Sequence, residues 1–131
     1  MEKALIVGGS NGIGLAIALE LSQTYKHVII VDKVAPDNTI PSNCSFTKAN
    51  LLSGDFSFLN NFNDIDTLVI TAGFGRVAAF ESITSTEINN SFKVNTIAIF
   101  QILRHYFKRI QQSTPFHCAV MGSIAGLVSS P

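Results

Sequence analysis

Three glycines and one acid near the N-terminus have the types and spacing of a nucleotide-binding site. Gly8, Gly12 and Gly14 follow an apolar run and open a segment whose apolar residues have helical spacing. Glycine permits a sharp turn, and it lets backbone approach a ligand where a Cβ would collide. The free N–H groups at a helix start, with the positive end of the helix dipole, suit a pyrophosphate. These residues therefore predict that a dinucleotide binds over the turn.

The acid lies at the distance from this turn at which a carboxylate binds a ribose diol. Asp32 ends an apolar run and follows Gly14 by 18 residues, close to the ~20 expected. A carboxylate accepts two hydroxyl groups but repels the 2′-phosphate of NADP. No Arg or Lys occurs at positions 9–11, and Lys33 is the one nearby cation. The sequence thus favours NAD over NADP; the alternative is a plain glycine turn with a solvated strand-end acid.

The strands that hold these residues are predicted from apolar runs. Runs or alternations typical of strands occur at 4–7, 27–32, 45–49, 64–70 and 117–121. The turn formers of 33–43 predict a loop rather than a crossover helix. Strands that alternate with helices form parallel βαβ units, and right-handed crossovers give the order 3-2-1-4-5. We therefore predict one α/β domain over 1–131, a Rossmann-type doubly wound parallel sheet, with the nucleotide crossing between the first and fourth strands.

Three helices are predicted between the strands. The first begins at the glycine turn with Ile13, Ile17 and Leu21 on one face, and a short one spans 53–63. The longest begins at the capping box of 84–87 and runs to about residue 111. Its apolar stripe consists of Ile88, Phe92, Ile99, Leu103, Phe107 and Ile110, widened by Val94, Ile97 and Phe100. So broad a surface covers the sheet and leaves a face for a partner, which predicts a homo-oligomer.

Four further residues have two readings each. Asn50 follows the third strand, where its amide could meet an adenine edge or simply form a turn. Ala72 and Gly73 leave room for a ligand at the end of the fourth strand, as an ordinary strand-to-loop turn also would. Asn95 lies among apolar neighbours in the long helix, so it either bonds within the core or organises water.

Composition bounds the function. The 131 residues are 47% hydrophobic and 14% charged, with a net charge of zero and no basic run, which argues against nucleic acid as the main partner. The apolar runs are too short to span a membrane, and no signal-peptide pattern is present, so we expect a cytoplasmic protein. Cys44 and Cys118 are expected to be small buried residues, and the three histidines are too scattered for a metal site.

Five elements, in order along the whole chain, resemble those of the short-chain dehydrogenase/reductase family. Residues 7–14 resemble its Thr-Gly-x-x-x-Gly-Ile-Gly turn, with Val7 in place of Thr. Residues 71–73 resemble the end of its Asn-Asn-Ala-Gly element, with Ile70 and Thr71 replacing both Asn. Asn50 stands where many members carry an adenine-binding Asp. Residues 94–95 resemble the Val-Asn helix motif, and residues 122–126 resemble the catalytic serine turn.

The resemblance implies an oxidoreductase acting on a small carbonyl or alcohol substrate. Ser123 would hydrogen-bond the substrate oxygen, and Asn95 would hold a water in a proton relay. The family's acid/base is a Tyr whose pKa a Lys four residues later lowers, and hydride passes between substrate and nicotinamide. The candidate cofactor-binding residues are Gly8, Ser10, Asn11, Gly12, Ile13, Gly14, Asp32, Asn50, Ala72 and Gly73, with no metal ligand.

The family's Tyr-Lys pair has no counterpart in this sequence. The family places the Tyr about thirteen residues beyond the Ser, whereas 8 residues follow Ser123. Neither Tyr25 nor Tyr106 has a Lys four positions later. We therefore expect the nucleotide-binding part of a longer dehydrogenase, inactive by itself. The alternative is a sensor or scaffold module that binds NAD(H) without turnover; a methyltransferase fits the glycine spacing less well.

Overall fold

A parallel sheet of five strands organises the chain. The computed structural model describes residues 2–75, 77–112, 114–123 and 127. Its strands are β1 Lys3–Val7, β2 His27–Asp32, β3 Cys44–Lys48, β4 Thr67–Ile70 and β5 His117–Val120. The strand order is β3-β2-β1-β4-β5, and every neighbouring pair is parallel. The predicted Rossmann-type order is therefore confirmed, and the segment between β2 and β3 is a loop, as expected.

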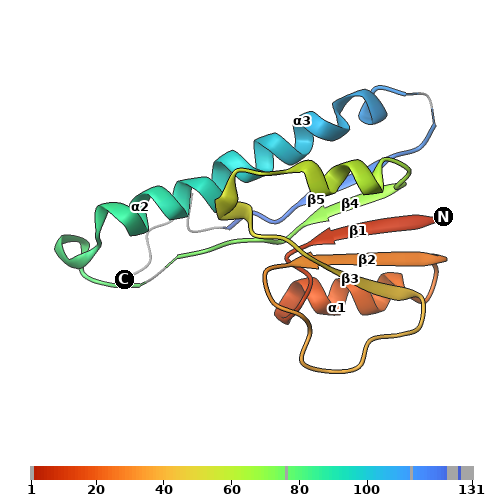
Figure 1. Ribbon diagram of the computed structural model, residues 1–131, viewed down its shortest axis with the longest axis horizontal. Coiled ribbons are helices and arrows are strands. Elements are labelled where there is room, and N and C mark those ends of the chain that lie inside the picture. Colours follow the sequence, from red (N-terminus) through yellow and green to blue (C-terminus); the bar gives the residue numbers. More distant parts are fainter. Residues whose placement is uncertain (1, 76, 113, 124–126, 128–131) are drawn as a thin grey trace.

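Helices cover both faces of the sheet (Figure 1). The α-helices are α1 Gly12–Leu21, α2 Ser85–Phe92 and α3 Ala98–Ile110, and the 3-10 helices are η1 Leu51–Ser53, η2 Ser57–Phe62 and η3 Phe80–Ser82. A π-helical segment, η4 Lys93–Ile97, joins α2 to α3. None of the described helices is long and apolar enough to cross a membrane.

The long predicted helix is confirmed in its extent but not in its regularity. It begins at the predicted capping box, in which Glu87 N donates to Thr84 Oγ1 over 3.1 Å and Thr84 N donates to Glu87 Oε2 over 2.8 Å. The π-helical segment then interrupts it, because Ala98 N donates to Lys93 O, one residue further back than in an α-helix. The predicted helix over 53–63 is instead the 3-10 helix η2, and it is preceded by η1, which ends at Ser53 before Gly54 takes a φ of 74°.

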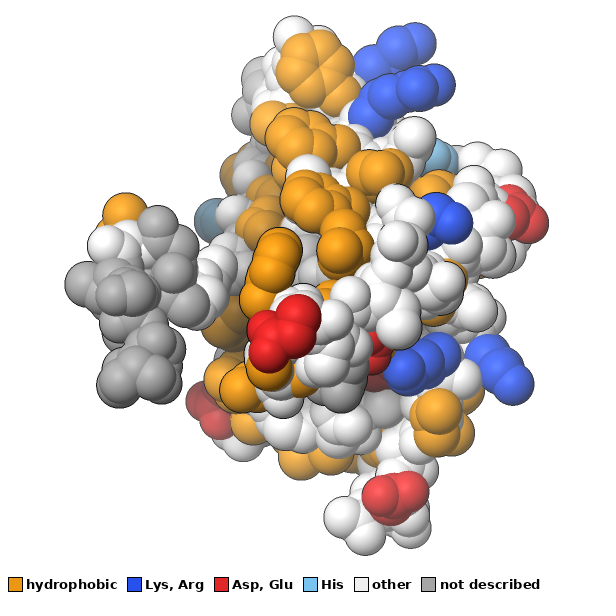
Figure 2. Space-filling model, turned by 90° about the vertical axis from the view of Figure 1, so that its left-hand side faces the viewer, with side chains coloured by type: hydrophobic (Ala, Val, Ile, Leu, Met, Phe, Trp, Pro, Cys, Tyr) orange, Lys and Arg blue, Asp and Glu red, His pale blue; other side chains and the backbone are white. Residues whose placement is uncertain are grey.

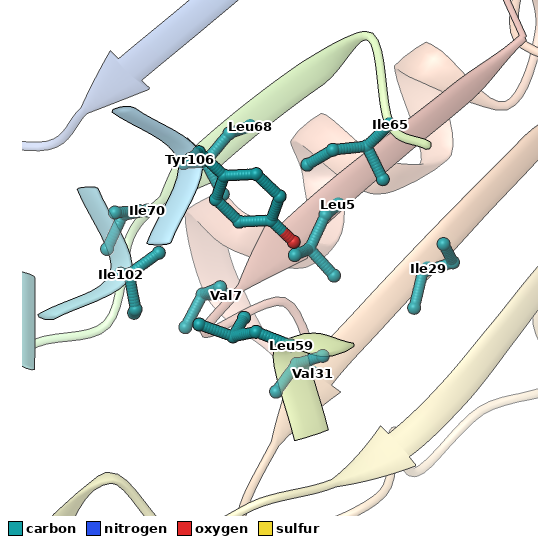
Figure 3. Packing of buried hydrophobic residues seen from close by; sticks show 10 residues of the cluster. All are labelled: Leu5, Val7, Ile29, Val31, Leu59, Ile65, Leu68, Ile70, Ile102 and Tyr106. Atoms are coloured by element: carbon teal, nitrogen blue, oxygen red, sulfur yellow. The ribbon is translucent and has the colours of Figure 1, made fainter. Parts of the chain in front are cut away.

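Alternation along the strands divides the core into two layers. Leu5 and Val7 of β1 contribute to the layer beneath α3 and η2, whereas Ala4 and Ile6 contribute to the layer beneath α1. Figure 3 shows the first layer, in which side chains of β1, β2 and β4 meet Ile102 and Tyr106 of α3 and Leu59 of η2. This packing fixes the carboxyl ends of the strands, where the candidate residues lie.

The face that α1 turns to the sheet is the predicted one in part, since Ile17 and Leu21 pack against the core but Ile13 does not. Gly14 and Ala18 are buried, whereas Ile17 and Leu21 are half-buried and Ile13 is 63% exposed. Small residues face the sheet because the helix start lies very close to the end of β1. A Cβ built on Gly14 would be 2.2 Å from Gly8 O.

The face that the long helix turns to the sheet also differs from the prediction. The buried positions are Val94, Ala98, Ile102 and Tyr106, at regular spacings of four residues. Most of the predicted stripe is exposed instead, including Phe92 at 62%, Phe100 at 70% and Phe107 at 55%. Ile99 and Leu103 are half-buried between the two faces. The phenylalanines therefore lie on the outside of the helix, and the buried face consists of Val94, Ala98, Ile102 and Tyr106.

The edge strand β5 is exposed along its whole length. Cys118 lies on this strand and is exposed, so the prediction that both cysteines are buried is correct for Cys44 alone. The reason is positional, since β5 has a neighbouring strand only on its β4 side in the described sheet.

Candidate nucleotide-binding site

A cleft of about 330 Å³ lies at the carboxyl ends of the strands. It extends from the segment after β3 to the segment after β4, across the point between β1 and β4 where the strand order reverses. Open α/β sheets bind ligands at this point. The lining residues are Val7, Gly8, Asn11, Val31, Asp32, Lys33, Ala49, Asn50, Leu51, Leu52, Thr71, Ala72, Gly73, Phe74 and Val94.

The glycine turn has the geometry that its sequence predicts. Gly8 has a φ of 89° and Gly12 a φ of 52°, a region that side chains other than glycine rarely enter. A Cβ on Gly8 would lie 2.5 Å from Ala72 N, so the close approach of the segment after β4 also requires glycine at this position. No described atom lies within 4 Å of a Cβ placed on Gly12, so the space above this residue is open.

The start of α1 presents amides that no described side chain caps. Asn11 has extended backbone angles at the N-cap, and within the described residues it makes no side-chain hydrogen bond to the helix. The first turn of α1 also carries no acidic residue. In contrast, α2 has a complete capping box. The first amides of a helix lack intrahelical acceptors, so those of α1 are suited to an anionic ligand.

Asp32 and the glycine turn are joined by hydrogen bonds. Ser10 N donates to Asp32 Oδ2 over 3.1 Å, and Lys33 N donates to Asp32 Oδ1 over 2.8 Å. The Ser10 hydroxyl donates to the carbonyl of Val34. These bonds orient the carboxylate at the rim of the cleft, and each oxygen keeps acceptor capacity for a further donor.

Asn50 is oriented by its own cap. Its Oδ1 accepts a hydrogen bond from Leu52 N over 3.0 Å at the start of η1, so the turn-forming role is present. The same bond directs the amide, and Asn50 also lines the cleft. Ala72 and Gly73 line the cleft beyond β4, beside Phe74.

Asn95 is exposed rather than buried, and its side chain is bonded to the loop after β4. Its Oδ1 accepts from Phe74 N over 2.7 Å, and its Nδ2 donates to Phe74 O over 2.6 Å and to Ser91 Oγ over 3.2 Å. The sequence left open a bond within the core or an ordered water; the observed bonds of this amide go to protein, but not within the core. The partner is backbone outside the core, brought within reach at the π-helical segment.

The predicted site residues are thus brought together in part. Gly8, Asn11, Asp32, Asn50, Ala72 and Gly73 line the cleft, whereas Ser10, Gly12, Ile13 and Gly14 support it or border it from the turn. Ser123 is exposed three residues beyond β5 and is not among the lining residues; the remainder of the predicted serine turn, 124–126, lies outside the described residues. Among the described residues, no three His, Cys, Asp or Glu side chains group as metal ligands do.

The two tyrosines are placed for packing. Tyr106 is 2% exposed, its hydroxyl donates to Phe62 O over 3.0 Å, and burial raises its pKa. A general base needs the opposite shift. Tyr25 is buried on the other face of the sheet, where its hydroxyl is hydrogen-bonded to Thr67 Oγ1.

Thr71 lines the cleft but is not among the predicted cofactor-binding residues, although the sequence groups it with Ala72 and Gly73. Its hydroxyl donates to Gly8 O over 2.9 Å, with Val7 O at 3.2 Å. The one indication in the sequence was that a polar residue follows the strand predicted to lie beside β1. That its hydroxyl bonds to the carbonyl of Gly8 became apparent only in the folded chain.

Comparison with known proteins agrees with this geometry. The chain is 26% identical to Dehydrogenase RED2 of Cochliobolus heterostrophus, in a match that covers 99% of this chain and 52% of the relative. It is 30% identical to Carbonyl reductase family member 4 of Xenopus laevis, covering 92% and 56% respectively. The chain therefore spans about half the length of the curated relatives that it matches.

Solved structures share the fold. A short chain dehydrogenase/reductase family protein superposes with a TM-score of 0.87 at 22% identity, covering 98% of this chain and 58% of that one. A short chain dehydrogenase from Leptospira borgpetersenii with bound NAD+ gives a TM-score of 0.79 at 25% identity, covering 99% and 54%. The family model for short chain dehydrogenases matches residues 2–131. With its sheet order, glycine turn and strand-end acid, the chain belongs to the short-chain dehydrogenase family.

Proposed function

We propose that the chain binds NAD(H) across the cleft, in preference to NADP(H), and that it is the nucleotide-binding part of an oxidoreductase acting on a small carbonyl or alcohol. The observation that carries the proposal is the uncapped start of α1, joined by hydrogen bonds to Asp32 at the rim of the cleft. Both groups match what a dinucleotide offers: a diphosphate for the amides and a ribose diol for the carboxylate.

The diphosphate is assigned to the amides of Gly12 and Ile13. The open space over Gly12 admits a phosphate close to the backbone. Asn11, which lines the cleft, leaves the helix start to the ligand because it does not cap it. The helix dipole adds an attraction of about 0.3–1 kcal/mol for a negative charge at this end.

Asp32 is assigned to the adenosine ribose. Its two oxygens, held by Ser10 N and Lys33 N, accept the 2′- and 3′-hydroxyls, and the same charge opposes a 2′-phosphate. Lys33 lines the cleft beside it and offsets part of that repulsion. The similar solved structures include one with bound NAD+ and one with bound NADP. The preference therefore rests on Asp32.

Asn50, Ala72 and Gly73 are assigned to the ends of the cofactor. The bond from Leu52 N engages Asn50 Oδ1, so Nδ2 is the group directed to an acceptor on the adenine ring. Ala72 has only a methyl group and Gly73 has no side chain, which leaves room where the ligand crosses the end of β4. When bound, the nicotinamide supplies or accepts the hydride.

Ser123 and Asn95 are proposed to serve the chemistry from the same edge of the sheet. Ser123 donates a hydrogen bond to the substrate oxygen and so stabilises negative charge that develops there. Asn95 holds the loop at Phe74 through its side chain, so the relay water is assigned to backbone at the π-helical segment. Ser10 and Gly14 keep the turn in place beneath the cofactor.

Turnover by these 131 residues alone is not expected, because they contain no Tyr-x-x-x-Lys and both tyrosines are buried. That same observation favours the second candidate, a module that binds NAD(H) without turnover. Carbonyl reduction by a protein that contains this chain supports the enzyme. Tight NADH binding by such a protein, without turnover on a panel of ketones and aldehydes, supports the sensor.

The cofactor assignment is tested by calorimetric titration of the chain with NADH and NADPH. We expect the unaltered chain to bind NADH more tightly than NADPH. The Asp32→Ala substitution should lower the affinity for NADH by roughly tenfold or more, and so reduce the difference in affinity between NADH and NADPH. Asp37→Ala is the matched control, since Asp37 is exposed in the following loop and lines no part of the cleft. Equal affinities of the unaltered chain for the two nucleotides would remove the role given to Asp32.

The partner and the compartment complete the proposal. Exposed apolar side chains of the long helix, which gather in one band on the face shown in Figure 2, are proposed to pair two copies of the chain. The net charge of zero provides no positively charged surface of the kind that binds nucleic acid, so we propose no nucleic-acid partner.

The proposed location is the cytoplasm. The two cysteines are free thiols, which agrees with a reducing compartment. Fractionation of cells checks the last point.

A further inference from the structure

We infer that Thr71 is a positioning residue for the nucleotide: its hydroxyl holds the glycine turn in its binding conformation from the β4 side. The inference rests on the proposed function, because it concerns the turn to which the diphosphate is assigned. It goes beyond that function in naming a residue that need not touch the ligand.

The glycine turn has little conformational restraint of its own. Gly8 and Gly12 both take positive φ values, and glycine occupies such values and their mirror images about equally. Contacts from neighbouring strands must therefore select one conformation. From the β2 side, Gly8 N donates to Val31 O over 2.8 Å, and Ser10 N donates to the Asp32 carboxylate.

On the β4 side, the hydroxyl of Thr71 is the corresponding restraint. Val7 O already accepts Thr71 N at 2.8 Å and Ala72 N at 3.1 Å, which joins the ends of β1 and β4. The Thr71 hydroxyl lies nearer to the next carbonyl, Gly8 O, at 2.9 Å. It thus reaches past the strand pairing and binds the first residue of the turn itself.

The bonded carbonyl faces the helix that carries the binding amides. A Cβ placed on Gly14 would lie 2.2 Å from Gly8 O and 2.5 Å from Thr71 Oγ1, so these three groups are in close contact. Rotation of the Gly8 peptide would therefore disturb the start of α1. By fixing that peptide, Thr71 keeps the turn and the amides of α1 in register.

Loss of the hydroxyl should reduce nucleotide affinity as well as stability. If the turn occupies its binding conformation only part of the time, the apparent affinity falls by that fraction. A hydrogen bond of ordinary net strength corresponds to a roughly tenfold change in such an equilibrium. Thr71→Val removes the hydroxyl at nearly constant shape, Thr71→Ala removes it without added bulk, and Thr71→Ser keeps it.

We expect Thr71→Val and Thr71→Ala to weaken NADH binding roughly tenfold in calorimetric titration, and Thr71→Ser to restore most of the affinity. Hydrogen exchange without nucleotide provides the second measurement. In the Val and Ala variants, the amides of residues 9–14 should exchange faster than in the unaltered chain, while those of β2 keep their protection.

Thr67→Val is the matched control, because it makes the same substitution in the same strand. Thr67 is buried at the opposite end of β4, where its hydroxyl is hydrogen-bonded to Tyr25. This variant should lower the midpoint of thermal unfolding yet leave NADH affinity and the exchange of residues 9–14 unchanged. It separates a loss of stability from a loss of positioning.

The outcomes distinguish this inference from the proposed function. Unchanged NADH affinity and unchanged exchange in Thr71→Val overturn the positioning role, whatever the stability of the variant. Equal losses of affinity in Thr71→Val and Thr67→Val also overturn it, since the effect is then a general one. Failure of the unaltered chain to bind NADH overturns the proposed function, while faster exchange of the turn in Thr71→Val still supports the restraint.

Discussion

At the scale of single residues, Gly14 has the least room for a side chain among the described glycines. Gly14 stands against the carbonyl of Gly8 and the hydroxyl of Thr71, and a Cβ built on Gly14 would lie 2.2 Å and 2.5 Å from those oxygens. Backbone cannot move aside as a flexible side chain does. Gly14 is therefore required by packing, whereas Gly12 is required by its φ of 52°, since the space above it is open.

Gly14→Ala should accordingly destabilise the fold and displace the binding turn. We expect a loss of about 1–3 kcal/mol in the free energy of unfolding, as overpacking of a tight site produces, together with loss of measurable NADH affinity. Urea unfolding and calorimetric titration measure the two effects. Gly75→Ala is the control, because no described atom lies within 4 Å of its Cβ position and it should change neither quantity. A Gly14→Ala variant as stable as the control contradicts the packing argument.

At the scale of elements, the long helix has two different apolar faces. Ala98, Ile102 and Tyr106 of α3 pack on the sheet, whereas Phe100 and Phe107 remain exposed. Large exposed aromatic side chains that recur along one helix form a surface of the kind that a partner buries. On the sheet-facing side Ala98 is small and fully buried, and Tyr106 finds a carbonyl acceptor at Phe62.

Polar replacement of the outer aromatic residues should therefore abolish self-association. We expect the double variant Phe100→Gln and Phe107→Gln to sediment as a monomer. Because both side chains are already exposed within one chain, the free energy of unfolding of the monomer should change by less than about 1 kcal/mol. Lys108→Gln, exposed on the same helix, should leave the association unaltered. Sedimentation velocity over a range of concentrations measures this, and an unaltered chain that is monomeric throughout removes the proposed pairing.

At the scale of the whole molecule, the two ends of the sheet differ in role. The carboxyl ends of the strands line the cleft, whereas Asp66 joins the amino ends through hydrogen bonds. The Oδ2 atom of Asp66 accepts hydrogen bonds from Glu2 N over 2.9 Å and from Lys3 N over 3.0 Å. Its Oδ1 atom lies 3.4 Å from Arg109 Nη2, and its backbone carbonyl accepts a hydrogen bond from His117 N over 2.9 Å. One residue thus joins β1, β5 and α3 to the start of β4.

These contacts predict an acid-sensitive stability. The hydrogen bonds from Lys3 N and Glu2 N, with the Arg109 charge, lower the pKa of Asp66 against the opposing effect of desolvation. A carboxyl whose pKa is lowered by folding stabilises the native state above its unfolded pKa. That contribution is lost as the pH falls through the folded value, here below about pH 4.

Asp66→Asn should therefore cost roughly 1–3 kcal/mol of unfolding free energy at pH 7, since it weakens hydrogen bonds to a charged group. The difference from the unaltered chain should shrink between pH 4 and pH 2. Urea unfolding across this range is the measurement. Asp64→Asn, which removes an exposed ion pair with Lys3, should cost at most about 1 kcal/mol at pH 7. A penalty for Asp66→Asn that does not change with pH would refute the electrostatic account.

Features that depend on neighbouring residues were open to prediction. The strands follow from apolar runs, the turn from glycines that must take positive φ, and the start of α2 from a capping box within four residues. Asp32 could be placed because the βαβ unit fixes the distance from glycine turn to strand end. The parallel order of the sheet followed from the handedness of the crossovers.

The faces of the helices required the tertiary structure. A helix with apolar residues on several sides offers more than one face, and the stripe predicted for the long helix includes bulky residues that the structure leaves exposed. In α1, Ile17 and Leu21 pack against the core as predicted, but the fully buried positions are Gly14 and Ala18. In the long helix, the π-helical segment changes the register by one residue, which periodicity does not reveal.

The sequence by itself determined the fold class, the glycine turn and the acid at the end of β2, because each depends on residues close together in the chain. The tertiary structure decided which groups restrain them: Ser10 against Asp32, Asn95 against Phe74, and Thr71 against Gly8. These partners are 22, 21 and 63 residues apart. A hydroxyl or amide has several possible acceptors in an unfolded chain, and only the packed sheet brings one of them within hydrogen-bond distance.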